Sequence, residues 1–239
     1  MCTVSWIHSR GGYQLLCNRD EKLARQAALA PRAVESGGVR YIAPVDGDRG
    51  GTWLSANARG VTVCLLNGWA GARRGTESRG LVVTRLAGAN SALEAVERAA
   101  ALDLRLYSPF TLVALEPDQP AMVLGWDGIR CRTRSDGDSL APLVSSSVDP
   151  EGVRIRRLAE FRDRARRGPL NGSSLFEFHR SHGSRARGDA YSACMHRDDA
   201  ETVSFSWVTV SPRAVEFFYT PAAPCRWAPG VTERLERRA

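Results

Sequence analysis

The sequence places a cysteine directly after the first methionine. Removal of Met1 would expose Cys2 as the first residue, and the small side chain of cysteine permits that removal. A free thiol is mostly protonated at neutral pH, whereas the thiolate is the nucleophile. An amino-terminal cysteine carries its own general base, because the reference pKa of an α-amino group is about 7.7–8.0. Cys2 is therefore our candidate nucleophile, and the chemistry would be attack on an amide carbonyl.

Two apolar-rich segments at the amino terminus must position this thiol. Residues 3–8 and 13–18 flank Arg10-Gly11-Gly12, which predicts a tight β-hairpin. With the turn centred there, the numbers of cross-strand partners sum to about 21–23, which places Cys2 opposite one member of the run Arg19-Asp20-Glu21. The hairpin alone would therefore bring charged side chains next to the thiol.

These charges have two explanations. Arg19 would lower the pKa of the Cys2 thiol by proximity, and Asp20 could hold and orient the α-ammonium group. Alternatively, the charged run is a solvated strand end and Cys2 is incidental. Spacing alone favours neither explanation, since functional sites and ordinary ion pairs look alike in a sequence.

The rest of the chain alternates groups of strands with groups of helices. Beyond the hairpin we predict strands at 52–56, 61–67, 110–116, 120–125, 128–133, 190–195, 202–210 and 213–219, and helices at about 91–104, 151–167 and 173–181. Residues 22–30 fit a short helical turn or loop that ends at Pro31, and residues 78–86 fit a strand or a helix. Antiparallel sheets covered by helices satisfy this order, whereas regular βαβ alternation does not.

No internal repeat or linker divides the chain. We therefore predict one domain over residues 1–221, followed by a loosely packed basic tail at 222–239. The first residues lack the basic and apolar regions of a signal peptide, and no run approaches the ~20 apolar residues that span a bilayer. We expect a cytoplasmic protein without a membrane span, and a homo-oligomer stays open.

The net charge of +7 does not indicate a nucleic-acid-binding protein. Such a surface needs its charge on one face, interleaved with exposed aromatic residues. Much of the arginine instead lies in 154–167, where Ile155, Leu158 and Phe161 follow helical spacing, and in the tail. This pattern favours a solvated basic helix face.

The six cysteines, at positions 2, 17, 64, 131, 194 and 225, are widely separated and form no C-x-x-C pair. This argues against a zinc cluster and against a disulfide scaffold. Cys17, Cys64 and Cys194 lie in apolar, strand-like runs, which predicts buried small hydrophobic residues. We predict no metal site.

Several short motifs in the first 90 residues are recognisable. Cys17-Asn18-Arg19-Asp20-Glu21, following Met1-Cys2-Thr3, resembles the signature of the NRDE family, also called the transport-and-Golgi-organisation family. Three later segments also resemble elements of that family. In chain order they are Gly51-Thr52-Trp53-Leu54 with Asn57 and Gly60, then Leu66-Asn67, then Ser78-Arg79-Gly80. The resemblance implies an α+β fold like that of N-terminal-nucleophile (Ntn) hydrolases, with four layers in the order helix, sheet, sheet, helix.

The same amino-terminal pattern is similar to that of bile-salt hydrolases and penicillin V acylases. By that resemblance Cys2 is the nucleophile, and Arg19 and Asp20 are its activating pair. Asn67, together with a backbone N–H near Cys2 or Gly68, would form the oxyanion hole.

The candidate substrate-binding residues are Asn18, Trp69, Ser146 and His196. Ser146 stands nearest the position where those families carry an asparagine, and a serine is shorter and donates only one hydrogen. His196 belongs to Ser192-Ala193-Cys194-Met195-His196, which resembles a block of cysteine acyltransferase relatives. It could contact substrate or could be a histidine satisfied at a strand end.

Two functions remain in competition. The first is hydrolysis or acyl transfer at the amide bond of a small N-acyl amide, through a thioester on Cys2 and without a cofactor. The second is a non-catalytic carrier of haem or of a lipid metabolite, as members of the NRDE family have been implicated in haem handling and lipid balance. Haem needs an axial ligand, and the histidines available are His8, His179, His182 and His196, none in a haem-attachment motif. Retention of Cys2, Arg19, Asp20 and Asn67 favours the enzyme.

Overall fold

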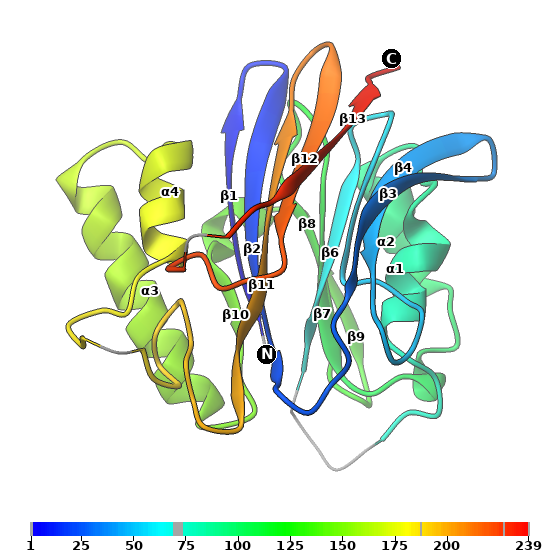
Figure 1. Ribbon diagram of the computed structural model, residues 1–239. Coiled ribbons are helices and arrows are strands. Elements are labelled where there is room, and N and C mark those ends of the chain that lie inside the picture. The colour runs from blue at the N-terminus through cyan, green and yellow to red at the C-terminus, as the bar shows by residue number, and fades with distance from the viewer. Residues whose placement is uncertain (1, 69–73, 187, 227, 239) are drawn as a thin grey trace.

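A computed structural model of the chain describes residues 2–68, 74–186, 188–226 and 228–238. Its first sheet has six antiparallel strands in the spatial order β10-β1-β2-β11-β12-β13 (Figure 1). These strands are β1 Cys2–Ser9, β2 Gly12–Lys22, β10 Leu143–Ser145, β11 Ala200–Val210, β12 Ala214–Thr220 and β13 Val231–Glu236. Strands from the two ends of the chain are thus neighbours, since β2 pairs with β11.

The second sheet has seven antiparallel strands in sequence order, β3 to β9. They are β3 Leu29–Ser36, β4 Val39–Val45, β5 Leu54–Asn57, β6 Thr62–Asn67, β7 Phe110–Leu115, β8 Met122–Trp126 and β9 Cys131–Arg134. The apolar inner faces of the two sheets pack against each other and form the central core, which includes Val4, Leu15, Leu54 and Val113.

Four helices cover the outer faces of the sheets. α1 Gly80–Leu86 and α2 Ala92–Ala100 pack on the second sheet, and α3 Pro150–Arg167 and α4 Gly172–His179 pack on the first (Figure 1). Two short 3-10 helices, η1 Leu104–Leu106 and η2 Gly137–Leu140, lie in connections. The expected α+β sandwich with layers helix, sheet, sheet, helix is confirmed. No helix among the described residues is both long and apolar enough to cross a membrane.

The amino-terminal hairpin has the predicted geometry. Its register runs from Ser9 opposite Gly12 to Cys2 opposite Arg19. Gly11 adopts the left-handed region with φ of 73°, which a turn residue with a side chain rarely does. A Cβ atom on Gly12 would lie 2.0 Å from the carbonyl oxygen of Val210, so the close approach of β11 also requires glycine there. The turn therefore fixes which residue faces Cys2.

The two central cysteines behave as predicted. Cys17 and Cys64 are buried between the sheets, with their sulfur atoms 4.0 Å apart. The helix predicted at about 91–104 is the shorter α2, and Ser91 caps it by accepting a hydrogen bond from the backbone N–H of Glu94.

Three local predictions were wrong. The turn or loop expected at 22–30 ends at residue 28, because strand β3 already begins at Leu29 and contains Pro31, which is tolerated since β3 is an edge strand. Residues 190–195 form no strand. On α3 the buried stripe is Val153, Arg157 and Phe161, whereas Ile155 is 55% exposed. That helix face therefore contains a buried arginine.

The carboxy-terminal segment also differs from the expected loose tail. Residues 231–236 form β13, which pairs with β12 and places Leu235 opposite Val215. The Leu235 side chain is only 2% exposed and belongs to the central core. Leu235 is flanked by charged residues along this edge strand. Because of that charged composition, the sequence analysis did not predict a strand here. The segment 222–239 is thus part of the sandwich at 231–236.

Leu235→Ala is expected to lower the free energy of unfolding by about 2–5 kcal/mol, because it removes a buried leucine from a closed core. The matched control is Val231→Ala, on the same strand but 44% exposed, which should change stability by less than about 0.5 kcal/mol. Urea unfolding of both variants measures the difference. Equal stability of both variants and the wild type would show that β13 does not contribute to the core.

Candidate active site

A pocket of about 250 Å³ opens over Cys2 where the two sheets meet at one end. The first sheet contributes Cys2, Arg19 and Asp20 to its lining, and the second sheet contributes Asn67. All four residues predicted as catalytic therefore line one pocket, although Asn67 comes from a different sheet.

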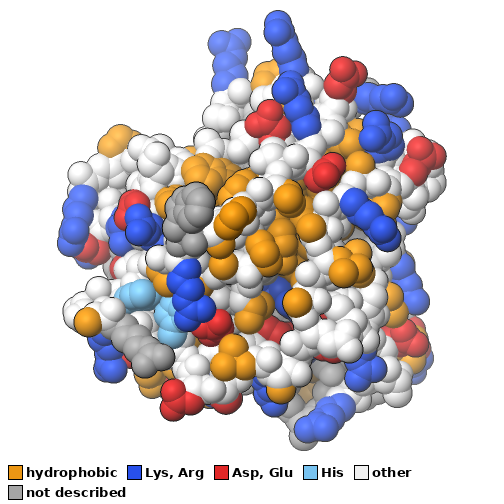
Figure 2. Space-filling model, in the orientation of Figure 1, with side chains coloured by type: hydrophobic (Ala, Val, Ile, Leu, Met, Phe, Trp, Pro, Cys, Tyr) orange, Lys and Arg blue, Asp and Glu red, His pale blue; other side chains and the backbone are white. Residues whose placement is uncertain are grey.

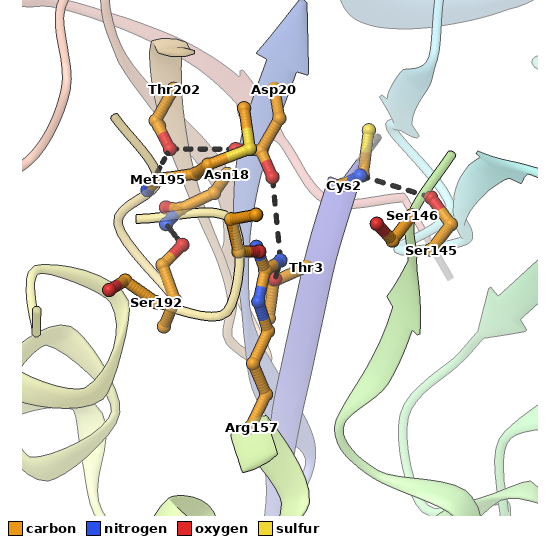
Figure 3. A network of polar contacts seen from close by, with 12 residues as sticks. Cys2, Thr3, Asn18, Asp20, Ser145, Ser146, Arg157, Ser192, Met195 and Thr202 are labelled. Atoms are coloured by element: carbon orange, nitrogen blue, oxygen red, sulfur yellow. Dashed lines mark hydrogen bonds and ion pairs between the residues drawn. The ribbon is translucent and has the colours of Figure 1, made fainter. Parts of the chain in front are cut away.

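Cys2 lies in the middle of a three-strand arrangement. It is paired with Arg19 on β2 and with Ser145 on β10. Its backbone N–H donates a hydrogen bond to the Ser145 hydroxyl at 3.0 Å (Figure 3). The side chain is 6% exposed, and this burial raises the pKa of the thiol to about 12. The thiol is therefore protonated at neutral pH.

Arg19 is held in place by other groups rather than directed at the thiol alone. Its guanidinium donates to Asp46 at 2.5 Å and lies 4.4 Å above the ring centroid of Trp53. The charge of Arg19 lowers the pKa of Cys2, as expected, but burial has the larger and opposite effect. Activation of the thiol by Arg19 alone is thus insufficient.

Although Asp20 is among the residues at the pocket, its side chain points to the other face of the sheet, as the alternation along a strand requires, and not to the side of the Cys2 thiol. One carboxylate oxygen accepts a hydrogen bond from Thr202 at 2.6 Å. The other lies 3.4 Å from the guanidinium of Arg157, and neither side chain is exposed to solvent. Arg157 reaches from α3 and also donates to the Thr3 hydroxyl (Figure 3). This buried ion pair fixes the carboxylate on the face of the sheet opposite the Cys2 thiol.

The sequence did not reveal Arg157. It is one of many arginines in the 154–167 run, and the spacing of Val153, Arg157 and Phe161 is the only signal that could have separated it. That signal becomes readable only when the buried face of α3 is known, because Ile155 and Leu158 offered an equally regular apolar stripe.

Asn18 is not part of the pocket lining, contrary to its prediction as a substrate-binding residue. It is completely buried on the helix side of the sheet, where its amide donates to the backbone oxygens of His179 and Ala193 at 2.8 and 2.7 Å. Its side-chain oxygen accepts from the His179 ring at 3.0 Å. Burial, and then the charge of Arg157, lower the pKa of His179 to about 3, so that ring is neutral. Asn18 joins β2 to α4 and to the segment after it.

Asn67 ends β6 and is paired with Phe110 on β7. It lines the pocket. The backbone N–H of Gly68 donates to the carbonyl oxygen of Pro109 at 2.8 Å, so it is engaged in the sheet and does not serve the oxyanion hole in this arrangement. Trp69 lies outside the described residues.

The remaining two predicted residues have other surroundings. The Ser146 hydroxyl bonds to the backbone of Val148, and it is the preceding Ser145 that contacts Cys2. His196 is not among the residues that line the Cys2 pocket. Its ring contacts Glu201 and Cys225 instead. Neither residue is placed as a substrate contact here.

Arg79 is a pocket residue that the sequence analysis did not select, although it stands in the recognised Ser78-Arg79-Gly80 element. Its guanidinium donates to the backbone oxygens of Pro109 at 2.9 Å and Gly68 at 3.3 Å, which ties it to the end of β6. Burial lowers its pKa, and the nearby Cys2 acts in the opposite direction. It adds a guanidinium, besides those of Arg19, Arg25 and Arg49, to the pocket that contains the thiol.

The amino-terminal half of the chain matches a known family. The profile of the family described as Transport and Golgi organisation 2 matches residues 1–134 of the 239. No curated protein sequence matches this chain significantly.

Solved structures with a similar fold include amide-hydrolysing enzymes. Penicillin V acylase from Agrobacterium tumefaciens has a TM-score of 0.60 at 11% sequence identity, over 93% of this chain and 83% of that chain. The N-acylethanolamine-hydrolyzing acid amidase ortholog from Caenorhabditis elegans has a TM-score of 0.59 at 13% identity, over 87% and 92%. A mutant of conjugated bile acid hydrolase from Clostridium perfringens has a TM-score of 0.58 at 11% identity, over 99% and 92%. At these identities the likeness establishes the fold.

Arg157→Met is expected to lower the free energy of unfolding by about 3–5 kcal/mol, because it leaves the Asp20 carboxylate buried without its ion-pair partner. Arg156→Met is the matched control, since Arg156 is the next residue of α3 and is exposed. Its effect should stay within about 0.5 kcal/mol. Denaturant unfolding of the two variants measures the difference. A similar small loss of unfolding free energy in both would mean that the buried Asp20 carboxylate does not need the ion pair with Arg157.

Proposed function

Because this chain belongs to the Transport and Golgi organisation 2 family and has the fold of Ntn hydrolases, we propose that it is an N-terminal cysteine amidohydrolase or acyltransferase that acts on small N-acyl amides. One observation carries this proposal: Cys2, Arg19 and Asn67, drawn from both sheets, line a single pocket, and the Asp20 side chain is fixed behind them on the other face of the first sheet. A carrier protein would not require a buried thiol at the second residue of the chain.

Before the reaction, hydrolysis of the peptide bond between Met1 and Cys2 by water releases methionine and frees the α-amino group of Cys2. The amino group accepts the thiol proton, and the thiolate sulfur then bonds to the carbonyl carbon of the amide. Negative charge develops on the carbonyl oxygen, and the Asn67 amide donates a hydrogen bond to it. When the C–N bond breaks, the leaving amine takes the proton from the α-ammonium group. A thioester on Cys2 remains.

The second half of the reaction releases the acyl group. Water, or an acceptor amine, loses a proton to the α-amino group and attacks the thioester carbonyl. Collapse of the tetrahedral intermediate expels the Cys2 sulfur, which takes the proton back as a thiol. Water gives a carboxylic acid, and an amine gives a new amide.

The pKa of the thiol explains why the amino group matters. Burial raises this pKa to about 12, so a free thiolate is rare at neutral pH and the proton must move to a base beside it. The nitrogen of Cys2, which already lies 3.0 Å from the Ser145 hydroxyl, becomes that base when Met1 is removed. Ser145 would thus orient the amino group, and the Asp20–Arg157 pair would hold the strand behind it.

Charged side chains around the pocket favour a polar substrate. Arg25, Arg49 and Arg79 line it together with Glu21 and Glu77. Arg25 is itself paired with Glu21 and Asp48, and Arg79 is held by backbone carbonyl oxygens. An amide with a charged or strongly polar group next to the scissile bond would find a complementary partner here.

Intact-protein mass spectrometry tests the function directly. After incubation with a panel of N-acyl amides, the wild type is expected to show loss of Met1 and an added acyl group on Cys2. Cys131→Ser should show both, because Cys131 is an exposed thiol outside the pocket. Cys2→Ala should show no acyl adduct. Retention of Met1 together with unmodified Cys2 on every amide would leave the haem- or lipid-carrier function ahead.

Asn67→Ala is expected to lower kcat by about 10²–10³, because one donor to the oxyanion is lost. The fold should be kept, since Asn67 is the last residue of β6 and its backbone pairing with β7 does not need the side chain. A control is Asn90→Ala, at an exposed asparagine before α2, which should leave kcat unchanged. Turnover within a few-fold of the wild type in Asn67→Ala would make Asn67 structural.

A further inference from the structure

Two histidines and two cysteines meet outside the Cys2 pocket. They are His182 and His196, Cys194 and Cys225, and one ligand atom from each lies within 4.8 Å of all the others. The His196 Nε2 atom is 3.2 Å from the Cys225 sulfur and 3.6 Å from the Cys194 sulfur. The two imidazole rings meet edge to face, with centroids 5.1 Å apart. Histidine side chains reach the surface on the side of the molecule where α3 and α4 lie (Figure 2).

Both histidines direct the same kind of atom into the cluster. The Nδ1 atom of His196 contacts the Glu201 carboxylate at 3.2 Å, which leaves Nε2 facing the sulfur atoms. The His182 ring hydrogen-bonds to the backbone of Ala186, and its Nε2 atom is buried without a hydrogen-bond partner among the described residues. A buried imidazole nitrogen without a partner, aimed at two thiols, is incomplete as a protein-only arrangement.

The backbone around the cluster is shaped to bring these side chains together. Thr202 and Met195 exchange hydrogen bonds across a turn, so Cys194 and His196 are held beside the start of β11. Gly188 packs against the rings: a Cβ there would lie 2.9 Å from His196 and 3.1 Å from His182. Cys225 enters from the segment after β12. Two loops far apart in the sequence therefore converge at one point.

We propose that His182, Cys194, His196 and Cys225 bind one Zn²⁺ ion. Tetrahedral zinc with Zn–S of about 2.3 Å and Zn–N of about 2.0–2.1 Å places its ligand atoms roughly 3.3–3.8 Å apart. The 3.2 and 3.6 Å separations around His196 are close to that spacing. On binding, both thiols lose their protons to solvent and both imidazoles bind as neutral rings. Four protein ligands fill the coordination sphere, so the ion is structural.

The outer contacts of the cluster match those that zinc ligands use. A carboxylate that holds the far nitrogen of a ligating histidine fixes its ring and raises its basicity, and Glu201 does this for His196. Glu201 is in turn held by Arg226 at 2.7 Å. A backbone partner, at Ala186, has the same effect on His182. A disulfide between the two cysteines would satisfy neither Nε2 atom.

The site would join the loop before β11 to the loop after β12. That loop before β11 is also tied to β2, the strand next to β1, because Thr202 binds both the Met195 backbone and the Asp20 carboxylate. The backbone of Ala193, next to Cys194, accepts a hydrogen bond from Asn18. Zinc would thus stabilise the layer behind Cys2 without touching substrate.

Metal analysis of the full-length protein, purified under reducing conditions without chelator, tests this inference. About one zinc ion per chain is expected in the wild type, in Cys131→Ser and in Cys2→Ser, and markedly less in Cys194→Ser and Cys225→Ser. The Cys2→Ser control excludes zinc held by the nucleophile. Replacement of zinc by Co²⁺ in the wild type should give thiolate-to-cobalt charge-transfer absorption and the visible bands of tetrahedral cobalt, which needs no variant to fold.

The inference is independent of the proposed enzyme activity, since its readouts are metal content and a spectrum. If Cys194→Ser fails to fold, Cys225→Ser keeps the test decisive, because Cys225 is only partly buried. Substoichiometric zinc with no tetrahedral cobalt spectrum overturns the site. So does equal zinc content in Cys225→Ser and Cys131→Ser, or a peptide map in which Cys194 and Cys225 are joined by a disulfide.

Discussion

The antiparallel register between β1 and β2 is the constraint on which the candidate site depends. It places Cys2 opposite Arg19, and strand alternation then assigns every neighbouring residue to one of two faces. Cys2 and Arg19 face the second sheet, while Thr3, Asn18 and Asp20 face α3 and α4. A shift by one residue would exchange these faces, expose the thiol to the helices and bury apolar residues among polar ones. Gly11 and Gly12 fix the turn that sets this register.

The helix-facing side of that hairpin is held by buried polar contacts. Arg157 bridges Asp20 and Thr3, and Asn18 joins His179 to the Ala193 backbone. Buried ion pairs add little net stability, because the cost of desolvation offsets the attraction, but removal of one partner is expensive. Such contacts specify one position for α3 and for the 179–196 segment. In the proposed reaction the thiol must stay close to its base, and these contacts hold the strand end in one position.

On the pocket side, burial and charge act on Cys2 in opposite directions. The thiol is removed from water by both sheets, which raises its pKa more than Arg19 lowers it. Arg19 is also largely neutralised by Asp46, whose carboxylate is 2.5 Å away. The balance favours a neutral thiol that is deprotonated only as it reacts. This arrangement makes a neighbouring base more important than a neighbouring cation, and the α-amino group would be that base.

The sequence alone predicted the hairpin with Cys2 opposite one of three charged residues, most strands, three of the four α-helices and the family, because these follow from local spacing and contiguous motifs. Cys2, Arg19, Asp20 and Asn67 could therefore be selected before any coordinates, and they share one pocket. Only the tertiary structure decided which face of each element is buried. In the structure Asn18 lies away from the pocket and Arg157 is buried. Leu235 packs in the core as part of β13, and Cys194 and Cys225 lie next to two histidines. Those contacts join residues that are far apart in the chain, such as Asn18 and Ala193, which are 175 positions apart, and no local periodicity records such a distance.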